Sequence, residues 1–153
     1  MKKSYPLFAI IVLFVALIYF LKPLLTPPNL GGEETFVKIA GQKIKVELAD
    51  TPLEHARGLS GRSGLKEDEG MLFVFSRPGL YPFWMKDMNF PIDIIWLDEK
   101  LKVISIKKNA QQDSYPDIFS PEVKAKYVLE VVAGFADKNN LQVGDKIENF
   151  VGP

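Results

Sequence analysis

Apolar and charged residues alternate along the chain after residue 34. In Lys43–Leu48, Ile, Val and Leu occupy every second position, and the positions between them are charged. A period of two is typical of a β-strand with one face buried and the other in water. Thr35–Ile39 precedes this segment across Ala40–Gln42, so the two strands are predicted to form a hairpin.

Further short apolar segments are bounded by Gly, Pro, Asp or Asn, which is more typical of strands than of helices. These segments are Gly70–Phe75, Pro82–Met85, Pro91–Leu97, Lys102–Lys107, Tyr127–Val132 and Lys146–Phe150. Asn109–Ser120 is polar and is predicted to be a loop. We therefore predict a mainly β domain of about seven or eight short strands, arranged as a sandwich or a squat barrel.

Two short helical segments interrupt the strands. Thr51 is a predicted N-cap, Pro52 takes the first helical position, and Glu54 is placed to complete a capping box. The residues expected on the buried face of this helix are Leu53, Ala56 and Leu59. His55 lies away from that face and is expected to be in solvent. The second helical segment is a turn within Ala133–Asn139.

The first 25 residues follow a different pattern. Ser4–Leu21 is an uncharged segment of 18 residues, and as a helix it would be about 27 Å long, close to the roughly 30 Å hydrocarbon core of a bilayer. A buried core helix is disfavoured because the segment has no polar face. A cleaved signal peptide is the main competing interpretation, since Lys2 and Lys3 could form its basic start. The residues after Leu21 are not the small residues that a cleavage site needs, so an uncleaved anchor is predicted.

The sequence is therefore divided into three parts. Residues 1–25 are predicted to form a cytoplasmic tip and a transmembrane signal-anchor, residues 26–34 a stalk rich in Pro and Gly, and residues 35–153 an extracytoplasmic β domain. Lys2 and Lys3 should stay on the cytoplasmic side. The expected location is the membrane, with a single crossing and the C-terminal domain outside the cytoplasm.

Composition excludes several function classes. The 32 N-terminal residues hold three lysines and no acid, which leaves 16 basic and 19 acidic residues in 33–153 and a net charge of −3. A domain of this charge, without a basic stripe, is not expected to bind nucleic acid. The chain has no Cys and one His, so disulfides, thiol nucleophiles and Cys- or multi-His metal sites are not expected. No cofactor is predicted.

The methionines raise the question of a copper site. Met71, Met85 and Met88 with His55 would suit soft copper(I), but their spacing forms no tight cluster. Methionine more commonly fills gaps in a core, so no metal site is predicted.

Six motifs resemble, in the same order, those of the bacterial and archaeal family of domains of unknown function numbered 192. They are Gly58–Arg62, Gly70–Phe75, Phe83–Met88, Pro91–Ile95, Leu129–Gly134 and Val143–Asp145. The resemblance covers residues 36–147 and implies a jelly-roll-like β fold, often behind a signal peptide or a single membrane helix. It supplies no reaction and no catalytic residues. Ser60 and Met88 stand where the family often has Met and Thr.

Asp93 interrupts an apolar strand, where it shares a face with Ile95 and Leu97. A buried carboxylate must be paired, hydrogen-bonded or protonated, because its bare burial costs several kcal/mol. The candidate partners are Arg57, Arg62 and Lys86. Such a pair would either be a structural lock or form the charged floor of a pocket.

The segment Phe83–Asn89 combines an aromatic side chain with polar residues before a proline. A flat ring beside a few oriented polar groups is a common way to bind a sugar or an amphiphile. An equally open interpretation is that Trp84 only fills the core. The residues predicted to bind a ligand are Arg62, Trp84, Lys86, Asp87 and Asp93.

Three function classes follow from these observations. The preferred one is a membrane-anchored extracytoplasmic β domain that binds an envelope ligand or partner without catalysis; a glycan, a lipid or a membrane protein would fit. The second is an extracytoplasmic hydrolase that uses carboxylates around Asp87 and Asp93. The third is a structural accessory that docks on a membrane complex through an apolar β face. No catalytic residue is predicted.

Overall fold

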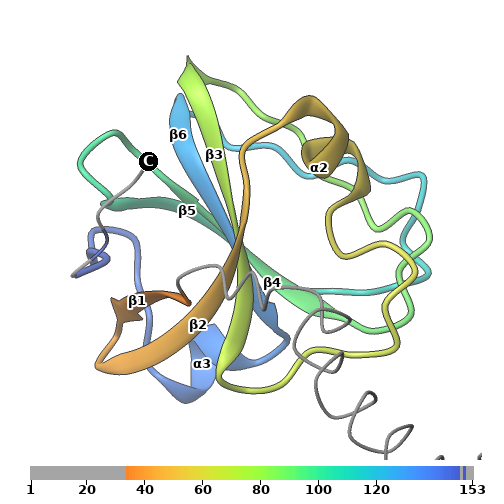
Figure 1. The fold of residues 1–153 in the computed structure, drawn as a ribbon, viewed down its shortest axis with the longest axis horizontal. Coiled ribbons are helices and arrows are strands. Elements are labelled where there is room, and N and C mark those ends of the chain that lie inside the picture. Colours follow the sequence, from red (N-terminus) through yellow and green to blue (C-terminus); the bar gives the residue numbers. More distant parts are fainter. Residues whose placement is uncertain (1–33, 149, 151–153) are drawn as a thin grey trace, which may run out of the picture. The chain divides into compact units, whose positions relative to one another are not determined.

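The computed structural model describes residues 34–148 and Phe150 (Figure 1). The predicted anchor, residues 1–25, and the stalk up to residue 33 lie outside the described residues. Within the described part of the chain, no helix is both long and apolar enough to cross a membrane.

The domain is built on a six-stranded sheet. Its strands are β1 (Thr35–Ile39), β2 (Gln42–Ala49), β3 (Glu69–Gly79), β4 (Ile92–Leu97), β5 (Val103–Ala110) and β6 (Ala125–Val132). The two helices of the described residues are α2 (Pro52–Arg57) and α3 (Phe135–Lys138). The spatial order is β1-β2-β3-β6-β4-β5, and neighbours are antiparallel except for the parallel pair β2–β3. The predicted mainly β fold with two short helices is confirmed.

The two edge strands of the sheet are bridged by the C-terminal segment. Lys38 on β1 exchanges backbone hydrogen bonds of 3.0 and 2.7 Å with Glu148. On the other side, the N–H of Val103 at the start of β5 donates to Asp145 at 2.8 Å, and Ile147 donates to Leu101 at 3.0 Å. The backbone groups of both edges are therefore partly satisfied by one segment.

The predicted hairpin forms as the alternation requires. Ile44 and Val46 are buried while the lysines between and beside them are exposed. The turn between β1 and β2 places Ala40 and Gly41 at φ of 48° and 77°, the positive values that two-residue hairpin turns need.

Two predicted strands are absent. Pro82–Met85 is a loop with a single bridge between Phe83 and Phe119, and the described residues of Lys146–Phe150 make only single bridges, at Lys146 and Glu148. Pro82 has no N–H to donate to a ladder, whereas the bridges of Glu148 and Lys146 go to Lys38 and Lys102, at opposite edges of the sheet. Six strands therefore replace the seven or eight expected.

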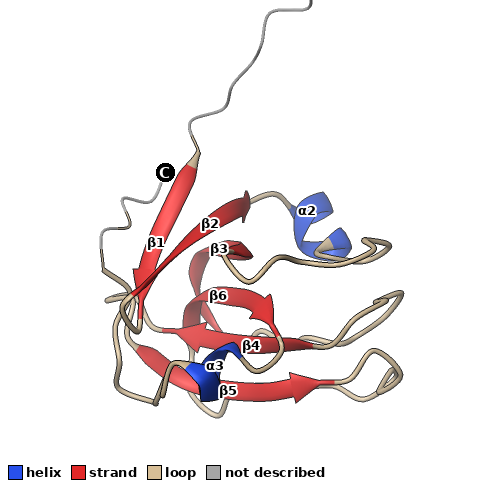
Figure 2. Ribbon diagram, turned by 90° about the horizontal axis from the view of Figure 1, so that it is seen from below, coloured by secondary structure: helices blue, strands red, loops and turns tan. Residues whose placement is uncertain are grey.

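Both faces of the sheet are covered. One cluster of buried side chains includes Leu72, Ile95, Leu129 and Phe135. The other includes Phe73, Ile94, Trp96 and Val128, on the face that carries α2 and the loop after β3. Along β4 and β6 successive side chains point to opposite faces, so each of these central strands contributes to both clusters. Figure 2 shows α2 following β2, and α3 beside β4 and β5.

Candidate functional site

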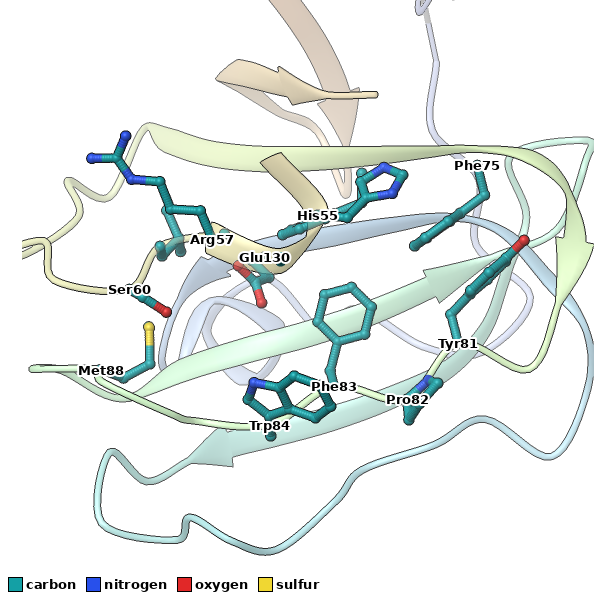
Figure 3. Close-up of a pocket in the computed structure, with 14 residues that line it drawn as sticks. His55, Arg57, Ser60, Phe75, Tyr81, Pro82, Phe83, Trp84, Met88 and Glu130 are labelled. Carbon is teal, nitrogen blue, oxygen red and sulfur yellow. The ribbon is translucent and has the colours of Figure 1, made fainter. Parts of the chain in front are cut away.

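A cavity of about 270 Å³ lies between α2, the loop after β3 and one face of the sheet (Figure 3). This volume is near the lower end of the range for small-molecule sites. Six of its fourteen lining residues are aromatic, and these form the aromatic wall of the cavity: His55, Phe73, Phe75, Tyr81, Phe83 and Trp84.

The helix α2 places His55 on this wall. Thr51 caps the helix, with Glu54 completing the predicted capping box. The Nε2 atom of His55 lies 2.9 Å from the Ala49 carbonyl oxygen; since that oxygen can only accept, Nε2 carries a proton and donates it. The ring packs 4.5 Å, centroid to centroid, from Phe75.

The prediction for the buried face of α2 was therefore wrong. No residue of α2 is buried: Leu53 is 80% exposed, and Ala56 is exposed too. Only Leu59, which follows the helix, is buried. The helix has fewer than two turns, and it meets the sheet through His55, whose ring packs against Phe73 and Phe75.

The loop after β3 forms the opposite wall and is held by backbone contacts. Trp96 Nε1 donates to the Tyr81 carbonyl at 3.0 Å, and Phe83 exchanges two backbone hydrogen bonds of 2.8 Å with Phe119. The Tyr81 ring stacks on Phe75 at 3.5 Å. These contacts leave Trp84 at the rim, with 46% of its surface exposed.

Glu130 supplies the only carboxyl group among the cavity-lining residues. It lies on the central strand β6, opposite Met71 on β3 and Ile94 on β4, and is only 5% exposed. Its Oε2 atom has no hydrogen-bond partner among the described residues. Burial raises the pKa of Glu130 from 4.5 to about 8, against a smaller lowering by the positive charge of Arg62.

Gly58 allows the chain to pass close to this acid. Its φ of +48° is one that side-chain-bearing residues rarely adopt. A Cβ atom at this position would lie 3.3 Å from the Phe73 ring and 3.9 Å from Glu130 Oε2. Any side chain here would therefore meet the wall and enter the space beside the carboxyl group.

The predicted ligand-binding residues are only partly brought together. Trp84 lines the cavity, as do Ser60 and Met88. Arg62 does not line it; its guanidinium pairs with Glu47 at 2.7 Å. Lys86 and Asp87 are exposed in the turn of the loop.

The turn nevertheless joins the two walls through its backbone. Ser60 Oγ donates to the carbonyl of Lys86 at 2.9 Å, and Gly61 N–H donates to the carbonyl of Asp87 at 2.8 Å. Asp87 has a φ of 57° in this turn. Lys86 and Asp87 therefore fix the loop without presenting their side chains to the cavity.

The predicted ion pair of Asp93 was wrong. Its side chain is fully buried and accepts backbone hydrogen bonds from Asn109 at 2.7 Å, Gly134 at 3.2 Å and Ala136 at 2.8 Å. None of the ion pairs between described residues involves it. Asp93 shares the sheet face of Ile95, as expected, but that face is opposite the one that carries the cavity. Three N–H donors replace the basic partner.

A protein-family model matches nearly all of the described residues. The model of the DUF192 family, described as "Uncharacterized ACR", matches residues 35–149. The chain belongs to the DUF192 family. This confirms the resemblance inferred from the six motifs.

The chain is also similar to a curated protein from Thermococcus gammatolerans. This UPF0127 protein is 30% identical over 107 residues, which cover 67% of this chain and 64% of that protein. The chain thus spans less than two thirds of that relative's length.

Two solved structures are similar to this DUF192 domain. A protein of unknown function from Novosphingobium aromaticivorans has a TM-score of 0.71 and 31% identity, covering 80% of this chain and 89% of its own. A Sinorhizobium meliloti protein described as a proposed transcription regulator has a TM-score of 0.70 and 29% identity, covering 75% of this chain and 91% of its own.

Sequence reasoning missed the most distinctive residue of the site. Glu130 is a single charge within the apolar strand Tyr127–Val132, the same signal that singled out Asp93. The site therefore has one buried acid, an aromatic wall and a half-exposed tryptophan at its rim. Chemically, this arrangement can hold the apolar part of a molecule against the rings and hydrogen-bond one polar group of the same molecule at Glu130.

Proposed function

We propose that this DUF192 domain binds a small organic molecule, or one end group of a larger one, in the cavity between α2 and the loop after β3, without catalysis. The observation that carries the proposal is the carboxyl group of Glu130. Its Oε2 has no partner within the described residues, and an unsatisfied buried polar atom costs about 1–3 kcal/mol. Such a cost is expected where a ligand supplies the missing interaction.

A hydrolase function has less support. Glycoside cleavage needs two carboxyl groups roughly 5–10 Å apart, whereas Glu130 is the single acid among the lining residues described here. Both oxygens of Asp93 accept backbone hydrogen bonds. A carboxylate engaged in this way is poorly suited to transfer protons.

Docking on a membrane complex and binding to DNA also fit the described residues less well. Docking through an apolar β face would need an uncovered face, and both faces of the sheet carry buried clusters. A transcription regulator, as proposed for the Sinorhizobium protein, would need a basic surface for DNA. The net charge of −3 in residues 33–153 does not favour this role.

We also propose that the domain is presented outside the cytoplasm by the anchor predicted for residues 1–25, so that its ligand comes from the cell envelope. The envelope glycan, lipid or membrane-protein partner expected from the sequence would then contribute the bound group. In this proposal the fold is a squat barrel rather than a jelly roll, because residues 145–148 hydrogen-bond to both edges of the sheet.

Topology can be tested directly. Protease added to intact spheroplasts is expected to digest residues 35–153, and the chain is expected to sediment with membranes. The reason is that an 18-residue uncharged segment is long enough to cross a bilayer. A shortened mature form in the soluble fraction would contradict the anchor, and full protection of the domain would contradict its orientation.

Trp84→Ala is expected to leave folding intact and to abolish binding. The ring is 46% exposed, so little core area is lost, while the rim of the cavity loses its largest apolar surface. The measurement is a thermal-shift screen of envelope glycans, lipid head groups and small metabolites, using the full-length chain in detergent. Compounds that raise the melting temperature of the wild type should have no effect on the variant.

Tyr115→Ala is the matched control, because Tyr115 is 51% exposed and does not line the cavity. A ligand that stabilises wild type and Trp84→Ala equally would show that the binding site is not the cavity beside Trp84. Consumption of a stabilising compound would favour the hydrolase instead.

A further inference from the structure

We propose that the ligand carries a protonated amine, which binds the carboxyl group of Glu130 while its apolar body packs against the aromatic wall. This inference rests on the proposed function and names the chemical class of the bound group: an organic ammonium ion with at least one N–H.

Glu130 has no cationic partner among the described residues. Glu130 lines the cavity and takes part in none of the ion pairs between described residues. Figure 3 shows the Arg57 guanidinium pointing away from the Glu130 carboxyl group, although Arg57 also borders the cavity. Arg62 is held by Glu47 at 2.7 Å. A buried acid in this position is best compensated by a cation that reaches it through the cavity.

The aromatic side chains of the cavity also suit a cation. In Figure 3 the Glu130 carboxyl group points into a space bordered by Phe83, Trp84, Ser60 and Met88. Faces of Trp, Tyr and Phe attract cations, most strongly where the contact is shielded from water. A neutral apolar ligand would use the rings but leave Glu130 without a partner. An anion would gain nothing from the ring faces, which attract cations.

The volume of the cavity limits the size of the bound group. About 270 Å³ admits a compact group rather than a polymer chain. The ammonium must therefore belong to a small molecule, or to an amine-bearing end group of a larger envelope component whose remainder stays outside, next to Trp84.

Other titratable groups at the cavity are His55 and Arg57 on α2 and Tyr81 on the loop. Arg62 acts on Glu130 from outside the lining. Glu130, with a pKa raised to about 8 by burial, is mostly protonated at pH 7 in the empty cavity. Binding of an ammonium ion should therefore release a proton from it.

The test compares benzylamine, which is protonated at pH 7, with benzyl alcohol, which has nearly the same size and no charge. Calorimetric titration of the full-length chain in detergent should give benzylamine the higher affinity, by up to about tenfold, because the gain from a charge-assisted hydrogen bond is offset by about tenfold for removing the Glu130 proton at pH 7. Titration in two buffers of different ionisation enthalpy should show release of most of one proton per bound amine. Glu130→Gln should remove both the preference and the proton release, whereas Glu99→Gln, at an exposed position, should change neither.

The wild-type comparison decides the outcome even if Glu130→Gln does not fold. Equal affinities for the two probes, or tighter binding of benzyl alcohol, would overturn the ammonium assignment and leave the binding function standing. Absence of binding by benzylamine would overturn the assignment too. The binding function itself would fail only if the whole thermal-shift screen gave no ligand.

Discussion

Replacing Glu130 with glutamine is expected to remove a large pH dependence of stability. In the folded protein burial raises the pKa of Glu130 from 4.5 to about 8. Between these values the folded state holds a proton that the unfolded state has lost, so raising the pH favours unfolding. Each unit of pKa difference corresponds to about 1.36 kcal/mol. The wild type should therefore lose up to about 5 kcal/mol of unfolding free energy between pH 4.5 and pH 8 from this group.

The measurement is urea unfolding of the full-length chain at several pH values, followed by the fluorescence of its two tryptophans, Trp84 and Trp96. Glu130→Gln should show a flatter pH profile than the wild type and should be the more stable protein at pH 9. Glu99→Gln removes the same charge from an exposed position and should follow the wild type. Parallel profiles for wild type and Glu130→Gln would show that the carboxyl group is not buried as described.

The strands were predictable because burial on one face leaves a period of two in the sequence. Lys43–Leu48 shows this most clearly, and the turn at Ala40 and Gly41 fits the hairpin that it implies. The capping box at Thr51 was equally visible, since it depends on residues within one helical turn. What these features share is that neighbours along the chain determine them.

The position of the cavity was not predictable for the opposite reason. Asp93 and Glu130 give the same signal, one acid within an apolar strand. Alternation shows that each shares a face with its neighbours two residues away, but it does not show which face α2 and the loop after β3 will cover. That depends on the crossover between the parallel strands β2 and β3, a contact between distant segments. His55 was misplaced because the packing of a short helix depends on this crossover as well.

Asp93→Asn is expected to lower stability by about 2–4 kcal/mol, because the amide cannot accept hydrogen bonds on both sides. In the wild type one oxygen accepts from Asn109 and Gly134, and the other accepts from Ala136 at 2.8 Å. In the variant one of these positions becomes an NH₂ group facing an N–H donor. The site is fully buried, so water cannot replace the lost acceptor.

Urea unfolding at pH 7 measures this loss, with Asp137→Asn as the control. Asp137 lies in α3 next to the same turn, but its side chain is 71% exposed and pairs with Lys108 on the surface. Its replacement should cost less than about 1 kcal/mol. Equal costs for the two variants would contradict the role of Asp93 in holding α3 against β4 and β5.

Asp93→Asn also tests whether the two buried acids, Asp93 and Glu130, have different functions. Because Asp93 lies on the sheet face opposite the cavity, folded Asp93→Asn should keep the preference for benzylamine over benzyl alcohol, and only its stability should fall. A loss of ligand preference in the folded variant would mean that the two faces are coupled through β4 and β6. Retained preference would leave Glu130 as the acid that recognises the ligand and Asp93 as the acid that holds the fold.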